Sequence, residues 1–301
     1  MRIGIDLGGT KTESVAIDDA GTERVRLRVS TPSHGYDEII ASIVGLVRDT
    51  EAQVGRTGTV GIGIPGAMSP ATGLVKNANT VVLIGHPLDR DLARALGRPV
   101  RVANDANCFA LSEASDGAGA GARVVFGVIV GTGTGGGLVV DGKLLTGPHA
   151  IAGEWGHNPL PWPRDDERPG PPCYCGRSGC IETFLAGPSL ARDHRLHTGE
   201  TRDAGDIAQR AEAGDAAAVA SMIRYEDRMA RSLASVINLL DPDVIVLGGG
   251  LSNIARLYRE VPLRLGQYVF SDTVSTPILP ARHGDSSGVR GAAWLWPIGE
   301  S

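Results

Sequence analysis

Residues 3–17 read IGIDLGGTKTESVAI, and this stretch decides how the fold is interpreted. Its apolar, partly β-branched start at 3–7 is typical of a buried strand, and Gly8-Gly9 separates it from a second such run at 12–17. The next four residues, Asp18-Asp19-Ala20-Gly21, have the composition of a turn and precede a third apolar run at 24–29. The chain is therefore predicted to open with three strands, the first two joined by a glycine turn.

The same arrangement returns at residues 124–140, which read VVFGVIVGTGTGGGLVV. We expect a strand at 124–130, a glycine turn at 131–137 and a second strand at 138–141, with a third strand at 143–146. The residues of the two cycles do not align, so the repeat is one of topology.

Helices and further strands follow each cycle. Apolar periodicity and turn residues predict helices at 37–54, 106–114 and 216–240, and strands at 60–64, 100–103 and 244–247. Strands that alternate with helices indicate an α/β fold with a mixed sheet. A doubled unit suggests two similar lobes with a cleft between them, where small ligands commonly bind.

Composition narrows the class of protein. A chain of 301 residues with 42% apolar residues has room for about two domains with sizeable cores. Its net charge of −5 argues against a non-specific nucleic-acid binder and against a protein that binds anionic membranes. Asp6 interrupts the apolar run that a signal peptide would need, and the uncharged stretch 124–140 contains too many glycines for a membrane helix. A cytoplasmic protein is expected.

Three glycine-rich segments follow predicted strands: GGTKT at 8–12, GTGTG at 131–135 and GGG at 248–250. Residues without Cβ let backbone N–H groups approach an anion closely, and threonine hydroxyls add donors. Each segment alone is consistent with a simple turn, but three together favour nucleotide binding. Gly131, Gly133 and Gly136 match G-x-G-x-x-G, yet a strand follows, which excludes a dinucleotide motif, and no Walker A sequence is present.

A metal site is indicated by His157, Cys173, Cys175 and Cys180, which lie close together in a segment rich in glycine and proline. Three thiolates and one imidazole complete a tetrahedral Zn²⁺ site, and four protein ligands make such a site structural. A disulfide is disfavoured by the odd number of thiols and the expected compartment. Cys108 lies far away in a predicted helix and is interpreted as an inert core residue.

Carboxylates near the predicted cleft are candidates for chemistry. Asp105 follows a strand and precedes a helix, so it fits both a helix cap and a general base, and the two roles are compatible. Asp6, at the end of the first strand, could hold a water bound to Mg²⁺.

Polar side chains that could bind a sugar cluster in the same regions. Glu154 and Glu182 flank the cysteine segment, which would fix both in space if it binds zinc. Together with Glu154, the amides of Asn79 and Asn104 are suited to hydrogen bonds with sugar hydroxyls.

In combination, these motifs resemble the ROK family (repressors, open reading frames and kinases) of bacterial sugar kinases. The matching segments, in family order, are DLGGTKT (6–12), GIPG (63–66), NDAN (104–107), GTG (131–133), EWGH (154–157), CYCGRSGCIE (173–182) and LGGG (247–250). Within the family, KNAN (76–79), GHNPLPW (156–162) and HGDSSGVRGAAWLW (283–296) are most similar to bacterial fructokinase and mannokinase. Thr134 departs from many relatives, which carry Cys or Val there.

The resemblance implies an actin-like, RNase H-type fold whose two lobes close on ATP and a hexose. The smaller lobe would comprise 1–117 with the returning segment 289–301, and the larger lobe, 118–288, would carry the zinc loop. Asp105 falls on the general base of the family. Sugar-contacting positions are Gly66, Asn79, Asn104, Asp105, Glu154, His157 and Glu182. Nucleotide-contacting positions are Asp6, Gly8, Gly9, Thr10, Lys11, Thr12, Thr132, Gly133, Gly249 and Gly250.

The implied activity is phosphorylation of the 6-hydroxyl of fructose, with mannose or glucose as further acceptors, by ATP and Mg²⁺. The alternative is an N-acetylglucosamine or glucose kinase of the same family. A ROK transcriptional repressor is disfavoured, because the first strand begins at Arg2 and leaves no room for a helix-turn-helix. An actin-like ATPase without a sugar substrate would not explain EWGH beside the cysteines. A homodimer is expected, without nucleic-acid or membrane partners.

Overall fold

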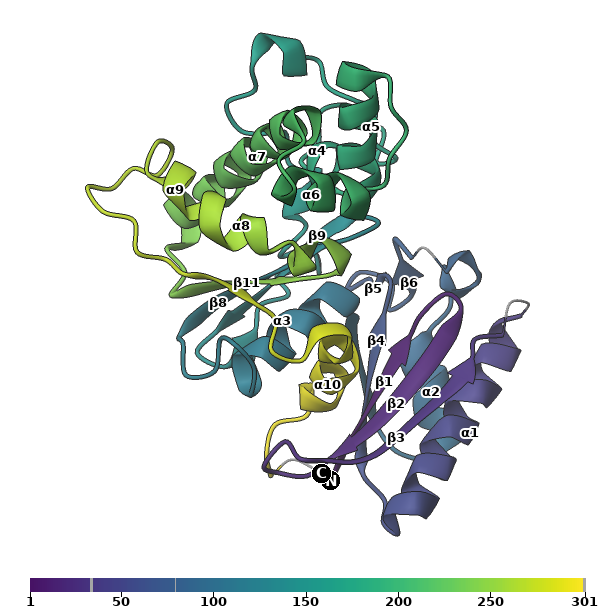
Figure 1. The fold of residues 1–301 in the computed structure, drawn as a ribbon. Helices are drawn as coiled ribbons and strands as arrows, with labels where there is room; N and C mark the ends of the chain where they lie inside the picture. The colour runs from purple at the N-terminus through teal and green to yellow at the C-terminus, as the bar shows by residue number, and fades with distance from the viewer. Residues whose placement is uncertain (33–34, 79, 300–301) are drawn as a thin grey trace.

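Two five-stranded sheets with the same strand order are the centre of the fold (Figure 1). The structure is a computed structural model, which describes residues 1–32, 35–78 and 80–299. The first sheet has the order β3-β2-β1-β4-β7, with bounds β1 (Arg2–Leu7), β2 (Lys11–Ile17), β3 (Glu23–Ser30), β4 (Thr59–Ile64) and β7 (Val100–Asn104). The second has the order β10-β9-β8-β11-β12, with bounds β8 (Val124–Val130), β9 (Thr134–Val140), β10 (Lys143–Leu144), β11 (Val244–Gly248) and β12 (Ile278–Pro280).

The strand pairing repeats as well. In both sheets the first three strands are antiparallel, and two further strands then extend the first one in parallel. The fold is therefore the two-lobed α/β fold with mixed sheets that the repeated sequence arrangement predicts.

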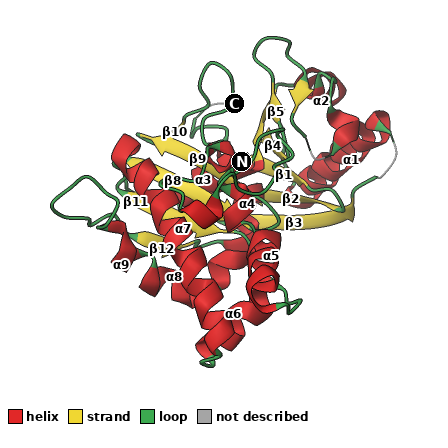
Figure 2. Ribbon diagram, turned by 90° about the horizontal axis from the view of Figure 1, so that it is seen from above, coloured by secondary structure: helices red, strands yellow, loops and turns green. Residues whose placement is uncertain are grey.

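Separate groups of helices cover the outer faces of the two sheets (Figures 1 and 2). Apolar side chains of β1 and β4 pack against α1 (Tyr36–Val54) and α2 (Leu88–Leu96) in one core. A second core joins β8, β9 and β11 to the helices of the other lobe. These are α4 (Glu182–Leu185), α5 (Gly187–Thr198), α6 (Ala204–Glu212), α7 (Ala216–Leu240), α8 (Ala255–Glu260) and α9 (Pro262–Leu265).

Two helices, α3 (Asp105–Ser115) and α10 (Ser287–Trp294), lie against each other between the sheets (Figure 1). Each crosses over: α3 follows β7 and packs on β8 and β9, whereas α10 follows β12 and packs on β1 and β4. Glycines permit this close approach, because a Cβ at Gly61 would lie 1.8 Å from the carbonyl oxygen of Ala292. Likewise, a Cβ at Gly291 would lie 1.6 Å from the carbonyl oxygen of Cys108. The crossing holds the first turn of α3 between the two lobes.

The predicted glycine turn at 131–137 is wrong in extent. The turn occupies 131–133, and the glycines after it belong to β9, which pairs with β8 from Thr134 onward. A Cβ at Gly137 would lie 2.8 Å from the Cβ of Ala110, and one at Gly136 would lie 2.8 Å from the indole of Trp155. These glycines allow a helix and an indole to pack closely on the strand. From composition alone, glycines that permit close packing cannot be told from glycines that form a turn.

Short elements complete the chain. They are β5 (Ala67–Met68), β6 (Val75–Lys76), η1 (Val81–Leu83), η2 (Trp155–His157), η3 (Asp165–Glu167), η4 (Gly250–Asn253) and η5 (Gly284–Ser286). The predicted helix at 216–240 is confirmed at both ends as α7. Within the described ranges, no helix combines the length and the apolar character needed to cross a membrane.

Candidate active site

Asp105 begins α3 and lines a cavity of about 260 Å³ between the lobes. Asn104, the preceding residue, is the helix cap: its Oδ1 accepts the N–H of Ala106 at 2.9 Å. The Asp105 carboxylate accepts the same N–H at 2.8 Å, but Asp105 is the first helical residue, so the cap that the sequence suggested for Asp105 is Asn104. Burial raises the pKa of Asp105, and the nearby charge of Glu154 raises it further. A carboxylate with a raised pKa in a cavity is a suitable proton acceptor.

Asp6, at the end of β1, lines the same cavity. Burial, with the charges of Asp105 and Glu13, raises the pKa of Asp6 to about 6. Two acidic side chains therefore line one cavity. A divalent cation would offset their repulsion, and carboxylate oxygens are the ligands that Mg²⁺ prefers.

The first glycine turn also reaches this cavity, through Gly8. The N–H of Gly8 donates to the carbonyl of Lys11 at 3.0 Å, and a Cβ on Gly8 would lie 2.8 Å from the same oxygen. Gly9, Thr10 and Lys11 are exposed on the turn, as a phosphate-binding loop requires. Thr12 differs from this expectation: it is fully buried, and its hydroxyl lies 2.9 Å from that of Thr31.

The other two glycine turns lie side by side. A Cβ at Gly249, where φ is +80°, would lie 2.5 Å from the carbonyl oxygen of Val130, just before the second turn. Gly249 lines the cavity together with Gly8 and Asp6, so turns from both lobes meet there. Thr132 and Gly250 are exposed next to it. The arrangement offers backbone N–H groups from two directions to one anionic ligand.

Glu182 and the segment that carries Glu154 are anchored on the first residues of β9. Glu182 accepts the N–H of Thr134 at 2.9 Å, and a Cβ at Gly133 would lie 2.7 Å from the same carboxylate oxygen. Trp155, which follows Glu154, donates its indole N–H to the carbonyl of Gly135 at 2.9 Å. The strand thus brings Glu154 and Glu182, which are far apart in sequence, to the same place.

Two more predicted sugar-binding positions are joined by a hydrogen bond. The Asn104 amide donates to the carbonyl of Gly66 at 3.3 Å, which connects the end of β7 to the turn after β4. Gly66 packs against Ala78, since a Cβ there would lie 2.7 Å from that of Ala78. Asn79, the remaining position, lies outside the described residues.

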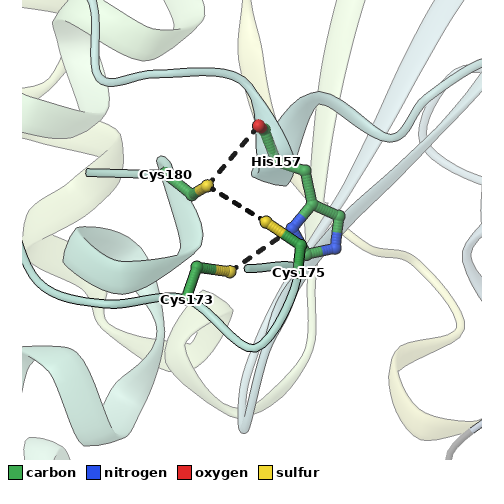
Figure 3. A group of neighbouring side chains, drawn as sticks. All are labelled: His157, Cys173, Cys175 and Cys180. Carbon is green, nitrogen blue, oxygen red and sulfur yellow. Dashed lines mark hydrogen bonds between the residues drawn. The ribbon is translucent and has the colours of Figure 1, made fainter. Parts of the chain in front are cut away.

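His157, Cys173, Cys175 and Cys180 point toward one another, and their ligand atoms all lie within 4.8 Å (Figure 3). The sulfurs of Cys175 and Cys180 are 3.6 Å apart, as are the Cys173 sulfur and His157 Nδ1. A tetrahedron with Zn–S bonds of 2.3 Å has an edge of roughly 3.8 Å, so these spacings fit zinc. His157 Nε2 lies on the other side of the ring, 2.9 Å from the Tyr174 hydroxyl. Nδ1 is therefore the nitrogen available to a metal.

Two residues near these sites were not among the predicted ones. Tyr174 stands between two of the cysteines, and its hydroxyl contacts the imidazole that was expected to help present the sugar. Thr31 follows β3 and bonds to the first glycine turn. The position of Tyr174 inside the cysteine motif could have marked it, whereas Thr31 is 23 residues from Gly8 and carries no sequence signal.

Paired sheets of this topology around a cleft define an actin-like ATPase fold, a class in which two lobes enclose a nucleotide. The sequence matches the ROK family model over residues 2–298. The chain belongs to the ROK family and is a sugar kinase of that family.

Among curated relatives, the N-acetyl-D-glucosamine kinase of Vibrio cholerae serotype O1 is 42% identical over 299 residues, covering 98% of this chain and 99% of that protein. The solved ROK hexokinase of Thermus thermophilus is 32% identical with a TM-score of 0.86, over 97% of this chain and 96% of the other. A ROK glucokinase of Streptomyces griseus, solved with glucose and AMPPNP, is 28% identical with a TM-score of 0.78, and each chain is covered to 99%.

Proposed function

We propose that this protein phosphorylates the 6-hydroxyl of N-acetylglucosamine with ATP. The substrate rests on the 42% identity with the Vibrio cholerae N-acetyl-D-glucosamine kinase over nearly the whole of both chains. This corrects the expectation of fructose, which rested on short segments of resemblance. Those segments are proposed to hold a hexose, but the choice among hexoses depends on the shape of the pocket around individual substituents.

The chemical step assigned to Asp105 follows from its place in the cavity. Its carboxylate accepts the proton of the sugar hydroxyl while that oxygen attacks the γ-phosphorus of ATP. The bond between the γ-phosphorus and the bridging oxygen breaks, and ADP leaves. The raised pKa of Asp105 makes this carboxylate a stronger proton acceptor than an exposed one.

Phosphate binding is assigned to the turns at 8–11 and 249–250. Backbone N–H groups of these turns would donate to phosphate oxygens without rearrangement during the reaction, starting at Gly9, because the N–H of Gly8 already donates to the Lys11 carbonyl. Asp6 is the carboxylate suited to hold Mg²⁺, either directly or through water, and Mg²⁺ would neutralise charge on the phosphates. Zinc is assigned a structural role, in which it holds the loop from His157 to Cys180 so that Glu182 lies beside β9.

A homodimer is part of the same proposal. Leu239, Leu263 and Phe270 are exposed apolar side chains in the second lobe, and such side chains are common at protein interfaces. Light scattering during size-exclusion chromatography measures the mass directly, and a monomer at assay concentration would contradict a dimer.

The substrate is tested with a panel of sugars and saturating ATP and Mg²⁺. The panel contains N-acetylglucosamine, glucose, mannose, fructose and N-acetylmannosamine, and kcat/KM is measured for each. N-acetylglucosamine is expected to exceed every other sugar at least tenfold. A preference for glucose would instead indicate a glucokinase, like the structurally similar protein of Streptomyces griseus. Release of ADP without any sugar would indicate an ATPase.

A further inference from the structure

We infer that Thr31 is a positioning residue for ATP, because its hydroxyl fixes the orientation of the peptide between Gly8 and Gly9 in the first glycine turn. The inference rests on the proposed function in one respect: it takes the phosphates of ATP to lie at this turn. Thr31 itself is outside the turn, directly after β3.

Two hydrogen bonds join Thr31 to opposite ends of the turn. Its Oγ1 donates to the carbonyl of Gly8 at 2.7 Å, and its backbone N–H donates to the carbonyl of Thr10 at 3.0 Å. Gly8 lines the cavity that also contains Asp6 and Asp105. Thr31 is thus bonded directly to the part of the turn nearest the proposed chemistry.

A second hydroxyl, that of Thr12, adds a third hydrogen bond to the group. Thr12 Oγ1 lies 2.9 Å from Thr31 Oγ1. Because the Gly8 carbonyl can only accept, the single hydroxyl proton of Thr31 is used there, and Thr12 must be the donor to Thr31. Thr12 is 0% exposed and Thr31 9% exposed, so water has little access to replace these bonds. A buried hydroxyl relay of this kind is stronger than its exposed equivalent and costly to break.

The relay determines where an N–H group points. The peptide unit is planar and trans, so the carbonyl of Gly8 and the N–H of Gly9 point in opposite directions. When Thr31 draws the carbonyl inward, the N–H of Gly9 is directed toward the exposed side of the turn. Two consecutive glycines would otherwise allow this peptide to rotate at little cost. Thr31 therefore prepares a phosphate donor before ATP arrives, which lowers the ordering cost of binding.

The molecule contains a matched control for this relay. Ser14 lies two residues after Thr12 on β2, and its Oγ is 2.8 Å from Thr50 Oγ1 in the buried interface with α1. Thr50 donates in turn to the carbonyl of Leu46 at 2.7 Å. The chemistry and burial are the same as in the Thr12–Thr31–Gly8 relay, but this second relay ends inside a helix and touches no glycine turn.

The test compares Thr31→Val, Thr31→Ser and Thr50→Val. Each is assayed for kcat, for KM of ATP and of sugar, and for the Kd of ADP without sugar by calorimetry. Thr31→Val should raise the KM of ATP and the Kd of ADP about tenfold and leave the KM of sugar within twofold. Thr31→Ser keeps the hydroxyl and should stay within threefold of wild type. Thr50→Val should lower the melting temperature but leave all binding constants unchanged.

The inference is overturned if Thr31→Val binds ADP as Thr50→Val does, or if the KM values for ATP and sugar rise together. If Thr31→Val does not fold, Thr31→Ala carries the same expectation. The ADP measurement separates this inference from the proposed function. A wild-type protein that phosphorylates no sugar, yet loses ADP affinity in Thr31→Val, would contradict the substrate assignment and support the role of Thr31.

Discussion

The carboxylate of Glu182 accepts a hydrogen bond from the backbone N–H of Thr134 at 2.9 Å. Glu182 begins α4, two residues after the last cysteine of the candidate zinc site, and Thr134 begins β9 directly after the second glycine turn. This bond connects the cysteine loop to the start of β9, next to the second glycine turn. A disturbance at either end should therefore be felt in sugar binding.

Gly133→Ala tests that connection. The new Cβ would lie 2.7 Å from the Glu182 carboxylate and would displace it from the Thr134 N–H. Loss of a hydrogen bond to a charged group costs about 1.5–3 kcal/mol, so the KM for sugar should rise roughly 10- to 100-fold. Gly266→Ala, at a position with nothing within 4 Å, is the control and should leave the KM unchanged. An unchanged KM for sugar in Gly133→Ala would contradict a link between the Glu182–Thr134 bond and sugar binding.

Metal analysis should give one zinc per chain. Cys173→Ser should lose the metal and, because structural zinc contributes directly to folding, lower the melting temperature by more than about 5 °C. The control is Cys108→Ala. Cys108 is the cysteine that lies outside the cluster, so this variant should retain one zinc. Metal-free wild-type protein with reactive thiols and undiminished stability would exclude the zinc site.

Asp6→Asn should make the protein more stable at neutral pH while lowering its turnover. The pKa of Asp6 is raised from 3.8 to about 6, so the folded state binds the proton more tightly than the unfolded state. The stability from this group is present below pH 4, falls as the pH rises to 6 and is absent above it. At 1.36 kcal/mol per pKa unit, the ionised carboxylate costs about 3 kcal/mol at pH 7.5.

Urea denaturation without added Mg²⁺ measures this effect. The variant should gain stability over wild type at pH 7.5, and the gain should shrink at pH 4.5. A variant that is less stable than wild type at pH 7.5 would mean that the Asp6 carboxylate has a favourable partner in the folded protein.

The crossing of α10 over the first sheet can be tested with a pair of glycines. Gly61→Ala would place a Cβ 1.8 Å from the Ala292 carbonyl, which the packed helix cannot avoid, so we expect loss of more than about 4 kcal/mol or failure to fold. Gly45→Ala, inside α1 with nothing within 4 Å, should stabilise by about 1 kcal/mol. Equal stability of the two variants in urea would contradict the close packing of α10 on β4.

Local patterns were sufficient to predict the repeated strand arrangement, the helix at 216–240 and the clustering of His157 with three cysteines. Each depends on residues close in sequence: alternating apolar runs, a helical period that ends at Asp241-Pro242, and a short cysteine motif. The lobe boundary at 117/118 stays a prediction. Because α3 and α10 each pack on the sheet of the other lobe, a single boundary in the sequence does not separate the packing of the two lobes.

Contacts between distant segments could not be predicted. Thr12 belongs to a glycine motif, but the alternation of β2 turns its side chain inward to Thr31. Arg228 and Arg231 lie on α7, where charged residues usually face water, yet both are buried against Glu167. Burial alone would raise the pKa of Glu167, but hydrogen bonds from these two arginines outweigh it and lower that pKa to about 2. The sequence between His157 and Cys173, which contains Glu167, has no periodicity that predicts these ion pairs.

The central claim is that Asp105 takes the proton from a sugar in the cleft. It is tested most directly by the kcat of Asp105→Asn with N-acetylglucosamine, ATP and Mg²⁺. Asn104 continues to cap α3, so the variant should fold with an unchanged circular dichroism spectrum. The kcat should fall by about 10²- to 10⁴-fold, with the Kd of ADP unaltered. A folded Asp105→Asn protein that turns over within a few fold of wild type would contradict the account.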